Sequence, residues 1–223
     1  LAYGPYFSAE MQLMAAAGYV VFYDNHRGST SYGEEFAMLL HYKYSSPEDF
    51  ADHMSGVDAV IEKGIADPEN LFITGGSAGG IASAYAIGLT DRFNAAAVAK
   101  PVVNWISKTL TADSYIGQIS HQFPGLPWEE FEHYWERSPL SLVGNMTTPT
   151  MLITGEDDQR TPISETEQLY QALKLKGVDT VMVRVPGSPH GIAGRPSRLV
   201  AKVDNILEWF RRYRTDIEGS ENE

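Results

Sequence analysis

The chain of 223 residues has a formal net charge of −12 and a sequence pI near 4.9, which argues against nucleic acid or an anionic membrane as its main partner. The absence of cysteine excludes disulfides and thiolate metal sites, and no zinc-type histidine spacing is visible, so we expect neither a metal nor another cofactor. With 43% hydrophobic residues, the chain can bury a large core as one domain.

The expected elements alternate between helix and strand. In chain order the sequence predicts a helix over 9–17, a buried strand over 19–24, a helix opening at 46–47, a strand over 71–74, a helix from about 81, strands over 95–99 and 150–154, a helix over 164–176, a strand over 180–185 and a helix over 196–213. This alternation with short connections predicts a mostly parallel sheet with helices on both faces.

One stretch, residues 109–145, interrupts this alternation. It is rich in aromatic residues and is expected to be a helical excursion between two strands. Trp128, Phe131 and Trp135 stand at helical spacing, which favours packing in the core over contact with a substrate.

A glycine-rich turn stands between an expected strand and an expected helix at residues 75–79. It reads Gly-Gly-Ser-Ala-Gly, so Ser77 is the central residue of a G-x-S-x-G pattern. Small neighbours permit a strained turn that projects the serine hydroxyl over the sheet edge and directs the next N–H toward an oxyanion. The pattern predicts Ser77 as a nucleophile and Ala78 as an oxyanion donor, although a simple glycine-rich loop before a helix would read the same in isolation.

The acid and the base that such a serine needs follow later in the chain. The expected strand before residue 155 opens into a loop with three adjacent acids, and the last expected strand opens into a loop that contains His190. Both loops begin where parallel strands end, which is where open α/β sheets hold active sites. The pattern predicts His190 as the general base and leaves three candidates for the acid, Glu156, Asp157 and Asp158. The other histidines are expected on the surface or in packing: His26, His41, His53, His121 and His133.

Several segments together resemble the catalytic domain of the prolyl oligopeptidase family, in its acylaminoacyl-peptidase and dipeptidyl-aminopeptidase-like branch. They are residues 75–80, Asp158-Gln159-Arg160-Thr161-Pro162, His190-Gly191, Asn25-His26-Arg27-Gly28-Ser29 and the helix expected over 49–64. The resemblance implies an α/β-hydrolase fold with a Ser-His-Asp triad. It selects Asp158 as the acid through its spacing to Arg160 and Pro162.

The sequence departs from the family pattern in three places. Ala78 stands where the family usually has tyrosine, and His26 stands where proline is common. The family's His-Gly-Gly-Pro segment, expected just before residue 1, is absent, so a second oxyanion donor would come from outside this sequence. We therefore expect residues 1–217 to be an α/β-hydrolase catalytic domain without its N-terminal strands, the C-terminal part of a larger enzyme that begins with a propeller domain. Residues 218–223 are expected to be a disordered tail.

The resemblance also suggests residues near the substrate. Arg160 would reach a substrate carbonyl on the acyl side, with an ion pair to Glu156 or Glu165 as the equal alternative. Val103 and Trp105 follow the strand after the nucleophile helix, where related hydrolases build an apolar pocket. A role in the core is at least as reasonable for both.

The expected function is that of a serine-type peptidase that hydrolyses short peptides through an acyl-enzyme, of aminopeptidase, acylaminoacyl-peptidase or oligopeptidase type. A carboxylesterase of the same fold and a non-catalytic fragment that needs a partner chain are the alternatives. The expected partners are peptide substrates and the upstream part of the same enzyme, and homo-oligomerisation stays open. We expect a cytoplasmic protein, with the periplasm as an alternative because the sequence begins with Leu1 rather than Met.

Overall fold

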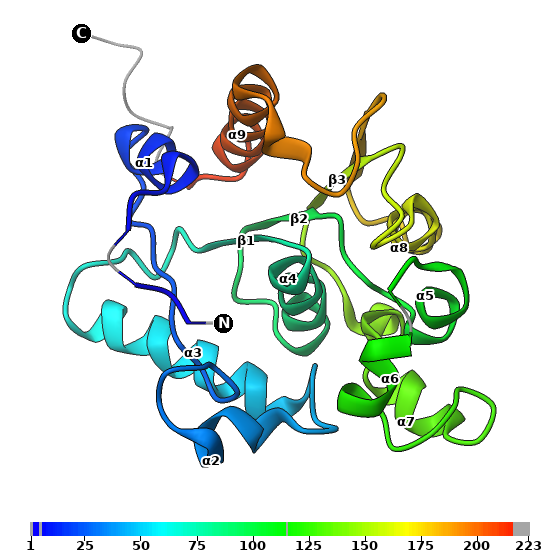
Figure 1. The fold of residues 1–223 in the computed structure, drawn as a ribbon. Helices are drawn as coiled ribbons and strands as arrows, with labels where there is room; N and C mark the ends of the chain where they lie inside the picture. Colours follow the sequence, from blue (N-terminus) through cyan, green and yellow to red (C-terminus); the bar gives the residue numbers. More distant parts are fainter. Residues whose placement is uncertain (1, 5, 115, 216–223) are drawn as a thin grey trace, which may run out of the picture.

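Four parallel strands form the centre of the structure, in the spatial order β1-β2-β3-β4 (Figure 1). They are Phe72–Gly76 (β1), Ala95–Ala99 (β2), Thr150–Gly155 (β3) and Thr180–Val185 (β4). This computed structural model describes residues 2–4, 6–114 and 116–215. The predicted strands over 71–74, 95–99, 150–154 and 180–185 are confirmed to within one or two residues at each end, and so is the parallel sheet.

The helices lie between the strands and on both faces of the sheet. In chain order the α-helices are Ala9–Ala16 (α1), Glu34–Ala37 (α2), Pro47–Glu62 (α3), Ala78–Leu89 (α4), Trp105–Thr111 (α5), Ile116–Gln122 (α6), Phe131–Glu136 (α7), Ile163–Lys176 (α8) and Pro196–Arg211 (α9), and the 3-10 helices are Met38–Leu40 (η1), Pro139–Asn145 (η2) and Ile192–Gly194 (η3). In the described part of the chain, no helix is both long and apolar enough to cross a bilayer. The tail expected over 218–223 lies outside the described residues.

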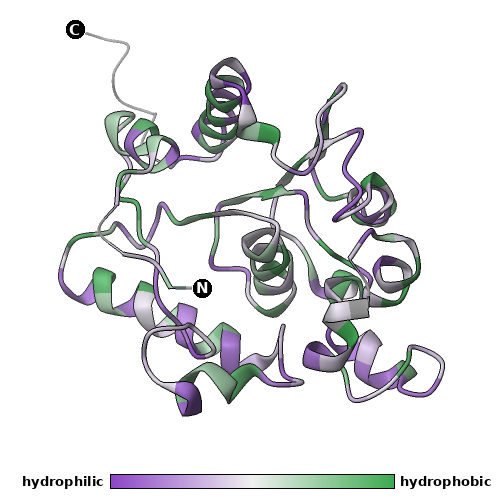
Figure 2. Cartoon of the chain, in the orientation of Figure 1, coloured by the Kyte–Doolittle hydropathy of each residue, from purple (hydrophilic) through white to green (hydrophobic). Residues whose placement is uncertain are grey.

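Alternate residues of the central strands pack against different helices. One core cluster joins α4 and α8 to one face of the sheet, through the strand residues Ala96, Val98 and Leu152. Another joins α1 and α9 to the opposite face, through Ala95, Ala97 and Met151. Figure 1 shows α1 and α9 above the sheet and α4 below it, and Figure 2 shows that α4 is mostly apolar. Because successive strand residues point to opposite faces, burial on both faces requires the continuous apolar runs seen in the sequence.

The long helix α3 begins where its capping residues predict. The hydroxyl of Ser46 accepts a hydrogen bond from the N–H of Asp49 at 3.3 Å, and Pro47 occupies the first turn. The cap satisfies an N–H group that the helix itself cannot pair, and proline needs no partner at this position. Asp49 and His53 consequently lie on one face of α3, one turn apart.

The prediction of a buried strand over residues 19–24 is wrong. The segment is extended but belongs to no strand ladder among the described residues, and Val20, Phe22 and Tyr23 are exposed. Tyr19 and Val21 do pack against the α1 and α9 cluster, so the apolar run that suggested a buried strand is covered on one side only. Strand propensity arises largely from packing on a half-buried surface, and it does not supply a hydrogen-bonding neighbour.

The helical excursion is confirmed over α5 to η2, but its predicted packing is wrong. Trp128, Phe131 and Trp135 are 69%, 52% and 37% exposed, whereas Tyr134 is fully buried and stacks on Phe123. Helix α7 is short, and its Phe131 and Trp135 share a face that points outward. Helical spacing identifies residues that share a face, but it does not say which face the protein covers.

Candidate active site

Ser77 lies in the sharp turn between β1 and α4. Its backbone adopts φ 59° and ψ −116°, a conformation that residues other than glycine rarely adopt. The N–H of Ser77 donates to the carbonyl of Ala99 at 3.1 Å and fixes the turn against the end of β2. A Cβ atom at Gly75 would lie 2.4 Å from the backbone of Gly79, so the turn requires glycine there. This strand, strained turn and helix have the geometry of a nucleophile elbow.

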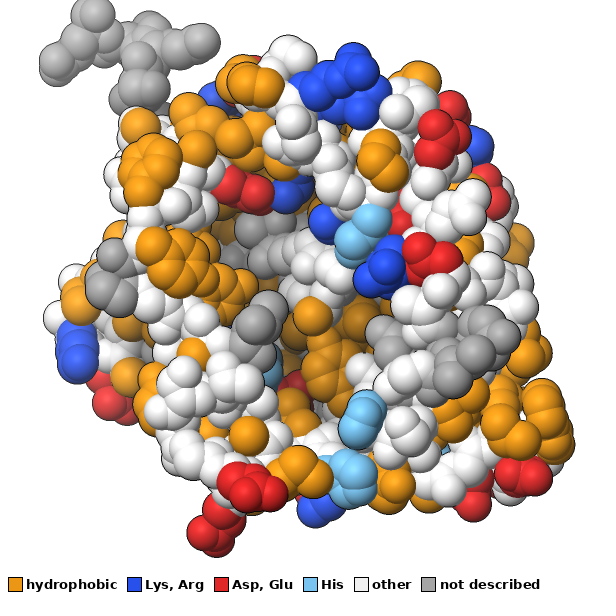
Figure 3. All heavy atoms as spheres, in the orientation of Figure 1, with side chains coloured by type: hydrophobic (Ala, Val, Ile, Leu, Met, Phe, Trp, Pro, Cys, Tyr) orange, Lys and Arg blue, Asp and Glu red, His pale blue; other side chains and the backbone are white. Residues whose placement is uncertain are grey.

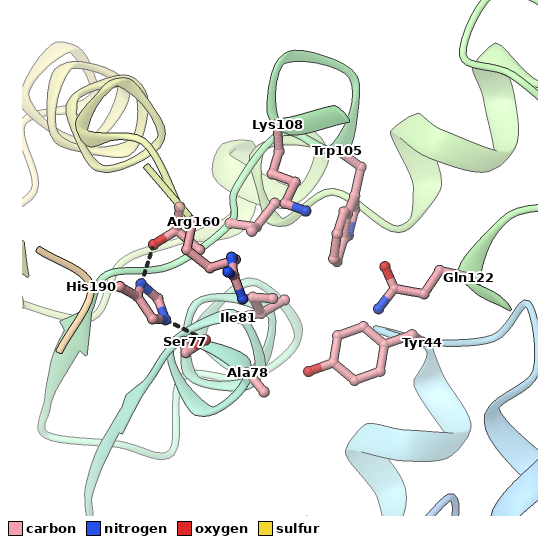
Figure 4. Close-up of a pocket in the computed structure, with 11 residues that line it drawn as sticks. Tyr44, Ser77, Ala78, Ile81, Trp105, Lys108, Gln122, Arg160 and His190 are labelled. Carbon is pink, nitrogen blue, oxygen red and sulfur yellow. Dashed lines mark hydrogen bonds between the residues drawn. The ribbon is translucent and has the colours of Figure 1, made fainter. Parts of the chain in front are cut away.

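The imidazole of His190 connects Ser77 to Asp158 (Figure 4). His190 Nε2 lies 3.0 Å from Ser77 Oγ, and His190 Nδ1 lies 2.8 Å from Asp158 Oδ2. A carboxylate only accepts hydrogen bonds, so Nδ1 donates to it and Nε2 can accept from the serine hydroxyl. Three residues that follow three different strands thus form one hydrogen-bonded chain, with the connectivity of a serine hydrolase triad.

The carboxylate of Asp158 is buried and held from several directions. Its Oδ1 accepts from the N–H of Arg160 at 2.9 Å and from that of Thr161 at 3.0 Å, while Thr161 Oγ1 lies 3.1 Å from Oδ2. Burial alone would raise the pKa of Asp158, but the hydrogen bonds from His190 and Thr161 outweigh burial and keep this pKa below its usual value. The carboxylate therefore stays ionised and fixed in orientation at neutral pH.

The loops that carry the acid and the histidine touch each other. The N–H of Asp157 donates to the carbonyl of Ser188 at 3.0 Å, and a Cβ atom at Gly155 would lie 2.1 Å from the same oxygen. The side chains of Asp157 and Glu156 are exposed, and Glu156 forms an ion pair with Arg184. Of the three adjacent acids, the structure therefore brings Asp158 to the histidine.

The N–H of Ala78 opens α4 directly after the serine. The first N–H groups of a helix have no partner within the helix, and the helix dipole favours negative charge at this end. Figure 4 places Ala78 beside Ser77 at the edge of a cavity. An oxyanion formed at a carbonyl attacked by Ser77 could accept a hydrogen bond from this N–H.

A cavity opens beside the hydroxyl of Ser77. Its walls combine apolar side chains with polar groups of the triad loops, and the lining residues are Tyr44, Ser77, Ala78, Ile81, Val102, Trp105, Lys108, Gln122, Arg160, Thr161 and His190. The face of the molecule in Figure 3 is hollowed near its centre, where histidine and cationic side chains meet hydrophobic ones. The cavity can therefore accept a side chain next to the acyl carbon that Ser77 would attack.

Lys108 gives the cavity a buried cation. Its side chain is almost fully buried, with Nζ 5.9 Å from the centroid of the Trp105 ring and 3.5 Å from Ser114 Oγ. No carboxylate in the described ranges lies within ion-pair distance of Nζ. Burial, reinforced by the nearby charge of Arg160, lowers the pKa of Lys108 to about 8. The amine is still mostly protonated at neutral pH, and within the described part of the chain it forms no ion pair.

The position of α5 is set by the buried side chain of Glu165 from α8. Glu165 Oε2 accepts from the N–H of Val103 at 3.0 Å and from that of Asn104 at 2.9 Å. Burial raises the pKa of Glu165, although these hydrogen bonds oppose the shift. The turn before α5 is thereby fixed, so Trp105 and Lys108, three residues apart, face the same cavity.

The three expected substrate-contacting residues, Trp105, Val103 and Arg160, differ in whether they line the cavity. Trp105 lines the cavity, whereas Val103 is fully buried between β2, α4 and α8 and does not reach it, which corrects that expectation. Arg160 also lines the cavity, and its Nε lies 2.7 Å from Asp113 Oδ1. The expected ion pair with Glu156 or Glu165 is therefore wrong, since a residue of the helical excursion takes this place.

The sequence analysis did not identify several residues that surround the hydrogen-bonded triad. Asp158 Oδ1 accepts the N–H of Arg160, two residues on, as in an Asx turn, and also the N–H of Thr161, three residues on. This local turn is a signal that could have found Thr161. Lys108 stands three residues after Trp105, just before the stretch expected to be helical, which is a weaker signal. Tyr44 comes from a distant loop, and its hydroxyl points toward Ser77 and Ala78 in Figure 4. No local pattern indicates that position.

The fold and the Ser-His-Asp chain define the class of this protein as a serine hydrolase with the α/β-hydrolase fold. The sequence model of the prolyl oligopeptidase family matches residues 5–216, and the chain belongs to this family. The resemblance stated from the sequence is therefore confirmed.

Similar proteins extend well beyond the length of this chain. The uncharacterized peptidase YuxL of Bacillus subtilis is 37% identical over 214 residues, which cover 95% of this chain and 32% of YuxL. The structure of Pyrococcus horikoshii acylaminoacyl peptidase matches with a TM-score of 0.89 and 30% identity, over 99% of this chain and 36% of that one. An acylaminoacyl peptidase in complex with Z-Gly-Gly-Phe-chloromethyl ketone matches with a TM-score of 0.87 and 30% identity, over 94% and 34%. The chain thus spans about a third of these relatives.

Proposed function

We propose that this chain carries the catalytic machinery of a serine peptidase that cleaves short peptides. The observation that carries the proposal is the hydrogen-bonded chain from Ser77 Oγ through His190 to Asp158, with distances of 3.0 and 2.8 Å. Hydroxyl, imidazole and carboxylate in this order convert a weak nucleophile into an effective one.

The proposed reaction proceeds through an acyl-enzyme. Ser77 Oγ attacks the carbonyl carbon of the scissile amide, and its proton passes to His190 Nε2. The carboxylate of Asp158 stabilises the resulting imidazolium, and the N–H of Ala78 donates to the oxyanion. The imidazolium then gives its proton to the departing amine as the C–N bond breaks. A water molecule repeats the sequence at the ester carbon, with His190 accepting its proton, and releases the acid and the free serine.

The cavity supports a specific class of peptide. We propose that it holds the side chain of the residue on the acyl side of the scissile bond, with Trp105 and Ile81 as apolar walls. Lys108 is a buried cation with no carboxylate of the described residues within ion-pair distance, so a substrate carboxylate can provide a partner. Peptides with aspartate or glutamate at this position are therefore the favoured substrates. The peptide-like ligand of the related acylaminoacyl peptidase is consistent with a peptide in this place.

The proposed function can be tested by covalent labelling of the full-length protein. An organophosphonate probe should form one adduct, which peptide mapping should locate at Ser77, and Ser77→Ala should abolish labelling. Ser83→Ala is a matched control because Ser83 is buried on α4, where its hydroxyl donates to the carbonyl of Gly79. An adduct on another residue would overturn the assignment. Turnover of an aminoacyl nitrophenyl ester without turnover of the matching nitroanilide would favour the carboxylesterase alternative.

A further inference from the structure

Two histidines and two aspartates gather where the extended segment before residue 27 meets α3. Asp24 and His26 come from the segment, and Asp49 and His53 come from adjacent turns of the helix. The two imidazole rings lie 4.4 Å apart between centroids. No step of the proposed reaction uses these four side chains, although they are partly or fully buried.

Each imidazole has a carboxylate on both sides. Their Nδ1 atoms face Asp24 Oδ1, at 3.0 Å from His53 and 3.6 Å from His26. Their Nε2 atoms face Asp49 Oδ1, at 3.4 Å from His26 and 3.9 Å from His53. A neutral imidazole has one N–H only, so it can donate to one of these carboxylates and must turn a lone pair toward the other.

The arrangement leaves buried polar atoms without partners. His26 Nδ1, His53 Nε2 and Asp49 Oδ1 are inaccessible to solvent and make no hydrogen bond. The side chain of Asp49 is only 8% exposed, and its unpaired oxygen points between the two rings. Buried polar atoms normally have partners, because leaving one unpaired costs roughly 1–3 kcal/mol. A cation bound on the Nδ1 side would accept the Nδ1 lone pairs and leave an N–H on each Nε2 to donate to Asp49.

We infer that Asp24, His26 and His53 bind a divalent transition metal ion such as Zn²⁺. A carboxylate oxygen of Asp24 and one ring nitrogen of each histidine lie within 4.8 Å of one another. The two Nδ1 atoms, which face Asp24, would be the histidine ligands. A tetrahedral zinc ion with nitrogen and oxygen ligands at about 2.0–2.2 Å separates them by roughly 3.4 Å, so small side-chain rotations suffice. Water would complete the coordination.

Asp49 provides hydrogen-bond acceptors for the Nε2 atoms that do not bind the metal. With Nδ1 of both rings on the metal, each Nε2 carries the proton and can donate to Asp49 Oδ1, which then has the partners that it lacks. Metal-binding histidines almost always donate their second N–H to such a group, which fixes the tautomer and the ring orientation. Two imidazoles with one carboxylate suit zinc, nickel or cobalt, whereas magnesium and calcium prefer oxygen ligands alone.

The metal would join two elements that share few other links. Segment 19–24 has no strand neighbour among the described residues, and the adjacent Arg27 already binds Asp52 of α3 through two side-chain hydrogen bonds. A metal at Asp24, His26 and His53 adds a second cross-link between the segment and the helix. We therefore expect the ion to stabilise the fold without taking part in the reaction at Ser77.

Calorimetry on the full-length protein, prepared without a polyhistidine tag and stripped with chelator, tests this inference. Titration with ZnCl₂ should show one equivalent of zinc bound per chain and a rise in the thermal midpoint. His26→Ala and His53→Ala should each weaken zinc binding at least about 100-fold, and Asp49→Asn should weaken it about 10- to 100-fold. His41→Ala, at an exposed histidine outside the cluster, should change nothing, and His190→Ala should retain the zinc.

Cobalt gives a reading on the unmodified protein that does not depend on whether the variants fold. One equivalent of Co²⁺ should produce visible absorption bands of a site with nitrogen ligands, and Zn²⁺ should displace them. Unchanged zinc affinity in both His26→Ala and His53→Ala would overturn the inference. So would an unmodified protein that binds no zinc, or one that prefers Mg²⁺ to Zn²⁺.

Discussion

Two imidazole–carboxylate pairs, His190 with Asp158 and His53 with Asp24, have almost the same geometry and different neighbours. His190 Nδ1 lies 2.8 Å from Asp158, and His53 Nδ1 lies 3.0 Å from Asp24. The histidine side chains are 27% and 25% exposed. Their second nitrogens differ, because Nε2 of His190 meets the hydroxyl of Ser77 whereas Nε2 of His53 faces the carboxylate of Asp49.

The group that faces the second nitrogen therefore decides what each imidazole–carboxylate pair can do. A hydroxyl can give up its proton and become a nucleophile, so the pair with Ser77 can move a proton during a reaction. An ionised carboxylate at Asp49 is an acceptor only, so it can take an N–H from either ring but cannot become a nucleophile through it. The pair on α3 is therefore suited to hold a cation, and the pair at the strand ends is suited to acid–base chemistry.

Removing the imidazole at the strand ends should have the largest effect. His190→Ala or Ser77→Ala should lower turnover by roughly 10⁴ to 10⁶, and the double variant should lose little more because the two residues act as a unit. His53→Ala should cost far less turnover, since no proton passes through its ring. Steady-state rates on a peptide nitroanilide measure all of these variants. Comparable losses of turnover for His53→Ala and His190→Ala, with both proteins folded by circular dichroism, would contradict the different roles assigned to the two pairs.

The acid partner gives the next largest effect. Asp158→Asn should lower turnover by about 10⁴ with the fold intact, because an amide no longer holds the imidazole in the required tautomer. Asp157→Asn is the matched control, since that exposed side chain does not reach the histidine. Turnover and thermal midpoint together test the pair. A larger loss for Asp157→Asn would move the assignment by one residue.

Lys108 tests the substrate class proposed for the cavity. A hydrogen bond to a charged group contributes about 1.5–3 kcal/mol, which corresponds to roughly 10- to 100-fold in rate. Lys108→Met should therefore lower kcat/KM by this factor for a substrate with glutamate on the acyl side and much less for its glutamine analogue. Lys174→Met, on an exposed helix position outside the cavity, controls for the loss of a charge. Equal losses on both substrates would refute the proposed role.

The pH dependence of this preference should be the smallest effect. Burial lowers the pKa of Lys108 to about 8, so its positive charge is present at neutral pH and is lost as pH rises through that value. The ratio of kcat/KM for the glutamate substrate to that for its glutamine analogue should accordingly fall between about pH 7 and pH 9. Lys108→Met should give a flat ratio. A ratio in the unmodified enzyme that does not change would show that Lys108 does not contact the substrate carboxylate.

The triad residues could be brought together from the sequence because each depends on a local pattern. The small residues around Ser77 permit the strained turn, and Asp158 and His190 follow apolar runs that become neighbouring parallel strands. A parallel sheet aligns the ends of such strands, so local patterns translate directly into proximity. The two strands β3 and β4 that precede the acid and the base were predicted for the same reason.

Other features depend on which surfaces meet, and no local pattern records that. Residues 19–23 form a continuous apolar run as a buried strand does, yet whether they pair depends on a neighbour elsewhere in the fold. Trp128 and Tyr134 are both aromatic, and only the packing of α7 leaves the first exposed and buries the second. The cluster around His53 combines a loop with a helix, so its residues show no metal-binding spacing along the chain.

The contact of Gly155 with the carbonyl of Ser188 has a mechanical consequence. Because backbone contacts backbone here, we expect the loop that carries the acid and the loop that carries the base to move together. Thermal motion that shifts this rim relative to Ser77 should leave the relative positions of Asp158 and His190 almost unchanged. The distance from His190 Nε2 to Ser77 Oγ is therefore the one triad distance that such a shift would change.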